Sequence, residues 1–173
     1  MSPSPDRLLA GGLRVRSAYL HRGTARALVH NFKYRGIEPA GRVLAAAMTP
    51  LIPEGATLVP LPRPGWRRLR YGIDPAPTLG DMLAAATGCP VVHLLRAPFL
   101  ASAQARVSRA QRNPPMFFAC GRGWPSRRRE GPLVLIDDVV TTGGTIASAQ
   151  RSIELNFGIG TVLAVTATNA GSD

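Results

Sequence analysis

The residues best suited to chemistry lie in one unbroken run, Val134 to Thr145, where two adjacent acids precede three threonines and two glycines. Glycines let the backbone approach a ligand closely, and threonine hydroxyls donate hydrogen bonds. If a helix starts here, its free N–H groups and positive dipole end favour an anion. A phosphate monoester would fit such a turn. The candidate binding residues are Asp137, Asp138, Val139, Thr141, Thr142, Gly143, Gly144 and Thr145.

The two acids, Asp137 and Asp138, need a different partner from the one that the turn binds. Carboxylates accept hydrogen bonds, and a vicinal diol donates two. A phosphate cup a few residues from a carboxylate pair therefore predicts a ribose 5-phosphate ligand, with both acids as catalytic candidates. The run contains neither the G-x-G-x-x-G pattern of a dinucleotide site nor the G-x-x-x-x-G-K-[ST] pattern of a P-loop. The alternative interpretation is a strand, a turn and a capped helix in which the acids are incidental.

The elements that must position this run alternate between strands and helices. The apolar run Pro132–Ile136 predicts a strand that ends just before the acids, at the carboxyl edge where open α/β sheets bind ligands. A helix is expected over Thr145–Leu155. Further strands are expected over Thr57–Pro60, Pro90–Leu95, Met116–Ala119 and Thr161–Thr166, and further helices over Thr24–Phe32, Glu38–Met48 and Asp74–Thr87. This alternation predicts an α/β fold, an open, mainly parallel twisted sheet with helices on both faces.

The composition is that of a globular protein with a basic surface. The chain has 173 residues, of which 45% are hydrophobic, and we expect a flexible segment over residues 1–18 followed by one domain over 19–170. No apolar run is long enough for a membrane span, and the first residues lack the pattern of a signal peptide, so we expect a cytoplasmic protein. The net charge of +11 favours polyanionic partners, either nucleic acid or small phosphorylated ligands. The three histidines show no metal spacing and are expected to be structural.

Several segments resemble known families. The run Val134–Thr145 resembles the phosphoribosyl pyrophosphate (PRPP) signature of type I phosphoribosyltransferases. The wider pattern is similar to the ComF family, a branch of phosphoribosyltransferase-like proteins. Phe32–Gly36 resembles its lysine-tyrosine-x-glycine element, Val59–Gly72 its second-strand loop, and Gln104–Asn113 its glutamine…arginine-x-asparagine stretch. Together these segments extend over residues 19–168, and the resemblance implies a phosphoribosyltransferase-like domain over 19–170.

The resemblance implies roles for individual residues. Asp137 and Asp138 would hold the ribose hydroxyls, and residues 141–145 would hold the 5-phosphate. Arg63 and Arg67 become candidates for binding pyrophosphate, which Mg²⁺ would help to hold as it leaves. A lid that excludes water from the reactive centre would include Gln104, Arg109, Arg112 and Asn113. The implied activity is Mg²⁺-dependent transfer of a 5-phosphoribosyl group to a base or an amine, with release of pyrophosphate.

The sequence departs from the ComF pattern in two ways. It lacks the cysteine-rich zinc module that often begins those proteins, so no structural zinc is expected, and no side-chain cluster predicts a directly bound metal. Tyr71 precedes Gly72, where the family usually has arginine. The alternative function is therefore a catalytically silent accessory protein in DNA uptake during natural competence, which keeps the phosphoribosyl site. Its partners would be single-stranded DNA or a helicase, no membrane partner is expected, and a homodimer is left open.

Overall fold

The computed structural model describes residues 1–9, 11–65, 69–70, 72–97, 118–119, 131–158, 160 and 163–171. Their main feature is a five-stranded sheet in the order β1-β2-β7-β6-β3. The strands are β1 (Arg7–Leu8), β2 (Arg14–Leu20), β3 (Thr57–Pro60), β6 (Leu133–Val140) and β7 (Leu163–Asn169). β1 pairs antiparallel with β2, and all other pairs are parallel. A separate antiparallel pair joins β4 (Leu95–Arg96) to β5 (Phe118–Ala119).

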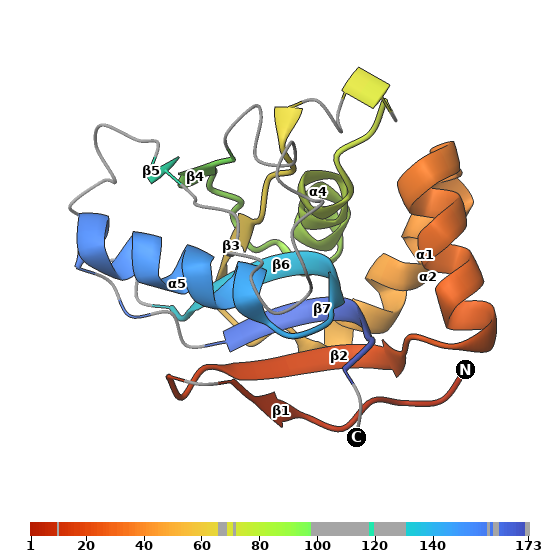
Figure 1. Ribbon diagram of the computed structural model, residues 1–173, viewed down its shortest axis with the longest axis horizontal. Helices are drawn as coiled ribbons and strands as arrows, with labels where there is room; N and C mark the ends of the chain where they lie inside the picture. The colour runs from red at the N-terminus through yellow and green to blue at the C-terminus, as the bar shows by residue number, and fades with distance from the viewer. Residues whose placement is uncertain are drawn as a thin grey trace, which may run out of the picture.

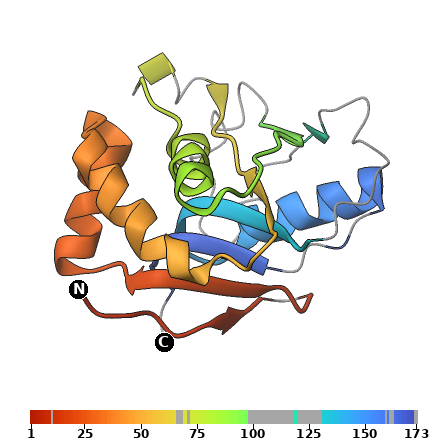
Figure 2. The same cartoon turned by 180° about the vertical axis from the view of Figure 1, so that it is seen from behind.

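Helices cover both faces of this sheet, as Figures 1 and 2 show from opposite sides. One face carries α1 (Gly23–Arg35), α2 (Glu38–Met48) and α4 (Pro75–Thr87), and the other carries α5 (Gly144–Phe157). A short 3₁₀ helix, η1 (Thr49–Leu51), follows α2. The predicted open, mainly parallel α/β arrangement is therefore confirmed. In the described part of the chain, no helix is both long and apolar enough to cross a membrane.

The strand β6 shows why the helices divide between the faces. Val134 and Ile136 pack in the cluster formed with α1, α2 and α4, whereas Leu133 and Leu135 pack in the cluster formed with α5. Successive side chains of a strand point to opposite faces, so a continuous apolar run produces two cores. Each of these four side chains is almost fully buried, and burial of one such side chain contributes about 2 kcal/mol. Packing on both faces therefore fixes the position of β6 and of the residues at its carboxyl end.

The sheet extends into the N-terminal segment that we predicted to be flexible. β2 begins at Arg14 and pairs along its length with β7, and Val15 is fully buried. The predicted boundary at residue 18 therefore falls inside a strand, and residues 14–18 belong to the sheet. The reason is the pairing with β7, which lies about 150 positions later in the sequence.

Two predicted elements agree with the structure in their bounds, and others need correction. The helix Glu38–Met48 and the strand Thr57–Pro60 are confirmed. The strand that we expected to end at Ile136 continues to Val140, because β7 continues to pair with it as far as Asn169. The expected strand Pro90–Leu95 has only one bridge, between Val91 and Leu58, before β4 begins at Leu95. Leu58 donates to the Pro90 carbonyl oxygen and accepts from the Val92 amide, but the next bond of this ladder would need an N–H that Pro60 lacks.

Candidate functional site

Asp137 and Asp138, called the acid pair below, lie within β6 near its carboxyl end and not beyond it. They have different surroundings. Asp138 is buried and contacts Lys33 of α1, which packs on one face of the sheet. Asp137 is half-buried and lines a small cavity together with Ile146 of α5, which packs on the other face. This divergence follows from the alternation of side chains along a strand.

The contact between Lys33 and Asp138 is the shortest hydrogen bond among the described residues of the site. Lys33 Nζ donates to Asp138 Oδ2 at 2.5 Å, and the exposed fractions of the two side chains are 18% and 7%. Lys33 is the single lysine of the chain and lies in the last turn of α1, 105 positions before its partner. Removal of one partner from a buried ion pair leaves an uncompensated charge, which is costly. The ion pair therefore fixes the end of α1 to β6.

The surroundings of the two acids shift their pKa values in opposite directions. Burial and the neighbouring carboxylate of Asp138 raise the pKa of Asp137 to about 8. Burial also acts to raise the pKa of Asp138, but the charge and hydrogen bond of Lys33, with the charge of Arg63, outweigh it and hold that pKa below its ordinary value. Two adjacent carboxylates with diverging pKa values are typical of sites in which one acid carries a proton and the other a charge.

The turn after β6 forms the cavity that Asp137 lines. The cavity, called the turn cavity below, has a volume of about 20 Å³. Five of the predicted ligand-binding residues line it, namely Asp137, Val139, Thr141, Gly143 and Thr145. Asp138, Thr142 and Gly144 of the same prediction are not among its lining residues. The structure thus brings Asp137 and two threonines to one small space at the start of α5.

The start of α5 is suited to an anion. Its N-cap is Gly143, with φ +82°, and its first turn has no acidic side chain. A helix of 14 residues leaves its first backbone N–H groups without partners in the helix and has a positive dipole end there. The amide of Gly144 lies 3.5 Å from the hydroxyl oxygen of Thr142. A phosphate group placed at this end would accept backbone and hydroxyl hydrogen bonds at once.

Two residues of the N-terminal segment, Arg7 and Leu9, contact the turn after β6. The Arg7 guanidinium donates to the carbonyl oxygen of Thr141 at 2.7 Å and to Asn169 Oδ1 at 3.0 Å. The side chain of Leu9 packs against Gly143, where a Cβ atom would lie 2.5 Å from Leu9 Cδ2. Gly143 is therefore required twice, by its positive φ and by this contact. Sequence reasoning treated the segment as flexible and missed both contacts.

Arg63, a predicted pyrophosphate ligand, lies beside the acid pair after the end of β3. Its guanidinium donates to the carbonyl oxygen of Lys33 at 3.4 Å and lies 5.9 Å from the centre of the Tyr34 ring. Its backbone amide donates to the Asp74 carboxylate at 3.3 Å. Asp74 occupies the predicted N-cap position of α4, but its carboxylate makes no capping hydrogen bond there. It anchors the loop after β3 instead, and so positions Arg63.

His21 is a residue of this site that sequence reasoning assigned only a structural role. It follows β2, and its Nδ1 lies 2.9 Å from Thr168 Oγ1, whose hydroxyl donates to the carbonyl oxygen of Asp138 at 3.5 Å. Burial and the charge of Arg26 lower the pKa of His21. The carboxyl ends of β2, β7 and β6 meet here, so only the strand order, which the sequence did not show, brings His21 near the acids.

The remaining predicted site residues lie outside the described residues. These are the pyrophosphate candidate Arg67 and the lid candidates Gln104, Arg109, Arg112 and Asn113. Within the described ranges, no three residues among histidine, cysteine, aspartate and glutamate are grouped so that they could hold a metal ion.

No family model matches this chain, and no curated protein sequence matches it. The resemblance to the ComF family therefore rests on the residues alone. A proposed function must therefore be based on the geometry of the acid pair, the turn cavity and Arg63.

Proposed function

We propose that this protein binds a 5-phosphoribosyl group at the carboxyl edge of its sheet and acts as a type I phosphoribosyltransferase-like enzyme. It transfers that group from PRPP to a base or an amine and releases pyrophosphate. The observation that supports this proposal best is the position of Asp137 and two threonines around the turn cavity, between the end of β6 and the start of α5. At about 20 Å³ the cavity itself has room for about one water molecule, so the ligand would lie at its mouth. A carboxylate for the ribose and an anion-binding turn for the 5-phosphate are thereby adjacent.

Mg²⁺ fits the acid pair only with help from the ligand. This ion prefers oxygen ligands in octahedral geometry and usually combines one or two carboxylates with substrate phosphates. Asp138 is already paired with Lys33, so Asp137 is the carboxylate that would hold the ion together with oxygens of PRPP. When bound, Mg²⁺ would offset the charge of the leaving pyrophosphate. Arg63, whose charge acts on Asp138, would add a second positive charge at this edge of the sheet.

The Mg²⁺ assignment has a thermodynamic test. Because burial and the Asp138 carboxylate raise the pKa of Asp137, that acid must lose a proton when a cation and PRPP bind. Calorimetry at pH 7 in two buffers of different ionisation enthalpy should show release of about one proton in the parent protein and of much less in Asp137→Asn. Equal proton release by both proteins would contradict a role for Asp137 in holding the ion.

The phosphate assignment is tested with ribose 5-phosphate. Replacement of Thr145 by valine removes a hydroxyl that lines the turn cavity and should weaken binding about tenfold, the loss expected for one hydrogen bond to a charged group. Thr87→Val is the matched control, because its hydroxyl donates to the Leu83 carbonyl in α4 and lies outside the site. Equal affinities of the two variants, or equal binding of ribose without phosphate, would refute the assignment.

Catalysis needs a separate measurement. Pyrophosphate release from PRPP with Mg²⁺ and a panel of bases and amines should be detectable in the parent and lost in Asp137→Asn and Asp138→Asn. Calorimetry with PRPP should also show weaker binding to both variants. Parent-like affinity in both would show that the acids do not hold the ribose.

A second function is favoured by the Lys33–Asp138 ion pair. This ion pair compensates the charge of Asp138 without any ligand. Such compensation is expected for a protein that still binds a phosphoribosyl group but no longer catalyses its transfer. Such an accessory protein would bind PRPP without turnover and would contact single-stranded DNA through its basic surface. Binding to DNA across a salt series distinguishes the two, because an electrostatic contact weakens steeply as salt rises. Turnover of PRPP without DNA binding at low salt would exclude the accessory role.

A further inference from the structure

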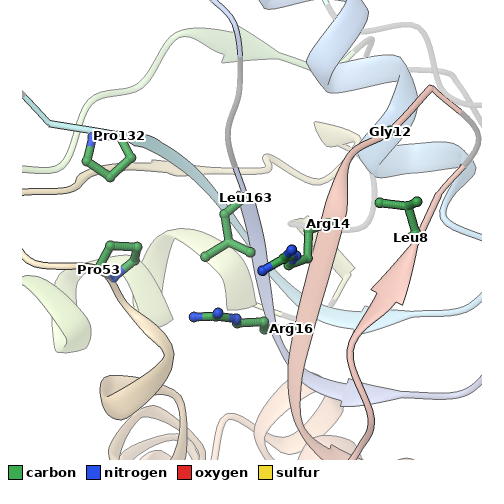
Figure 3. Close-up of a pocket in the computed structure, with 7 residues that line it drawn as sticks. All are labelled: Leu8, Gly12, Arg14, Arg16, Pro53, Pro132 and Leu163. Atoms are coloured by element: carbon green, nitrogen blue, oxygen red, sulfur yellow. The ribbon is translucent and has the colours of Figure 1, made fainter.

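A second and larger cavity lies at the opposite edge of the sheet. Its volume is about 470 Å³, within the range of roughly 300 to 1,000 Å³ typical of small-molecule sites. We call it the β2 cavity. Two arginines and four apolar residues are the part of its lining that matters here: Arg14, Arg16, Leu8, Pro53, Pro132 and Leu163. In Figure 3, both arginines extend from β2 toward Leu163 and Pro53.

The β2 cavity is far from the candidate site. Leu163 begins β7, whereas Thr168 and Asn169 at its other end lie beside the acid pair and the turn. Seven strand residues extend over roughly 20 Å. A small ligand cannot contact both places, so the β2 cavity is not a subsite for the phosphoribosyl ligand.

The two arginines form a pair on one face of β2. They are two residues apart, so their side chains leave the strand on the same side. Arg14 is exposed, and in the described part of the chain no carboxylate is paired with it. Arg16 Nε donates to Asp6 Oδ2 at 3.3 Å, and both side chains of this pair are accessible to solvent. An anion could therefore bind Arg14 directly and compete with Asp6 for Arg16.

The rest of the wall is apolar. Leu163 is 4% exposed and belongs to the core that packs under α1, α2 and α4, so the cavity reaches the rim of that core. Pro53 and Pro132 are half-buried and offer rigid apolar surface beside it. Two cations above an apolar wall match a ligand with an anionic group on an apolar body, because such a ligand satisfies both kinds of surface at once.

We propose that the β2 cavity is a second ligand site, specific for a small anion that carries an apolar ring or chain. Arg14 and Arg16 bind the anionic group, and Leu163, Pro53 and Pro132 contact the apolar part. Neither the phosphoribosyl chemistry nor its proposed reaction requires this site. The proposal stands whether or not the protein binds PRPP.

The chemical class is tested by calorimetry with naphthalene-1-sulfonate. It should bind about tenfold more tightly than 1-naphthalenemethanol, which lacks the charge, and than sulfate, which lacks the ring. The binding should be unaffected by an excess of ribose 5-phosphate. Displacement by ribose 5-phosphate would place the probe in the turn cavity, and equal affinity for the neutral alcohol would show an unspecific apolar surface. Either result overturns the proposal.

Two sets of variants of the full chain locate the binding. Arg14→Gln/Arg16→Gln should weaken binding of the sulfonate about tenfold or more. The control Arg42→Gln/Arg151→Gln removes the same charge from α2 and α5 and should leave the affinity nearly unchanged. An equal loss in both double variants would reduce the effect to net charge and refute the site. Circular dichroism and thermal unfolding establish that each variant is folded.

Asp6 provides a test in the opposite direction. Asp6→Asn frees Arg16 from its carboxylate partner, so the sulfonate should bind about threefold more tightly, as expected when a weak exposed pair no longer competes. Asp81→Asn on α4 removes the same charge and is the control. A gain in affinity confined to Asp6→Asn supports the proposal, and no gain, or the same gain in Asp81→Asn, contradicts the role of Arg16.

Discussion

The acid pair and the Thr141–Thr145 turn are neighbours along one strand, turn and helix, yet different forces hold them in place. The acid pair depends on charge, since Asp138 is paired with Lys33 and lies near Arg63. The turn depends on backbone geometry, through the positive φ of Gly143 and the close contact of Leu9. Charge can be tuned by pH and ligands, whereas the shape of the turn is set by its backbone torsions and by the packing of Leu9. We therefore expect the protonation of the acids to change with pH and the turn to keep its shape.

Among the substitutions, the largest loss of stability should follow from removing the cation that pairs with Asp138. Lys33→Met leaves the Asp138 carboxylate buried without its partner and should lower the free energy of unfolding by about 3 kcal/mol. Urea unfolding measures the loss. Arg42→Met is the control, because it breaks the exposed pair with Glu38 and should cost no more than about 0.5 kcal/mol. Similar losses in the two variants would show that Asp138 does not depend on Lys33.

Gly143→Ala disturbs the backbone geometry of the turn and should lower the free energy of unfolding by about 2 kcal/mol. Alanine disfavours positive φ, and its Cβ would lie too close to Leu9. Gly158→Ala is the matched control. It has φ +64° and no atom within 4 Å of the added Cβ, so it should cost about 1 kcal/mol. Thermal unfolding of both variants, alone and combined with Leu9→Ala, separates the two causes. If Leu9→Ala does not reduce the cost of Gly143→Ala, the contact is not what requires glycine.

The sequence predicted the position of the turn better than the surroundings of the acids, and the reason is physical. The glycines and threonines of the turn are consecutive, and their conformational and hydrogen-bonding preferences are local. The partners that set the state of the acids are distant: Lys33 is 105 positions away, and His21 approaches only because β2 and β7 are neighbours. The same reason explains why α2 and β3 were predicted with their bounds while β2 was missed. β2 follows a polar start and is stabilised by pairing with β7.

The pH dependence of stability should separate the two acids. The folded-state pKa of Asp137 is raised to about 8, so the folded protein holds a proton that the unfolded chain releases near pH 4. The free energy of unfolding therefore falls as pH rises from about 4 to about 8, by at most about 1.4 kcal/mol per pH unit. The pKa of Asp138 is lowered, so its contribution is present above pH 4 and is lost as pH falls below it. Urea unfolding from pH 3 to pH 9 measures both trends.

Variants assign these trends to their residues. Asp137→Asn should flatten the fall in stability above pH 4 and keep the loss in acid, whereas Asp138→Asn should reduce the loss in acid. If Asp137→Asn keeps the parent profile above pH 4, a different group carries the proton, and the division of roles within the acid pair is wrong.

The smallest effect concerns Arg7, which joins the turn and the end of β7 to the N-terminal segment. Arg7→Gln removes the hydrogen bonds to the Thr141 carbonyl and to Asn169, and should cost about 1 kcal/mol of stability. Because the carbonyl of Thr141 then loses the contact that orients the turn, affinity for ribose 5-phosphate should fall as well, by roughly threefold. Arg14→Gln is the control at the other end of the same segment and should leave that affinity unchanged. A loss of stability without a loss of affinity would show that Arg7 supports the sheet and that the turn keeps its shape without it.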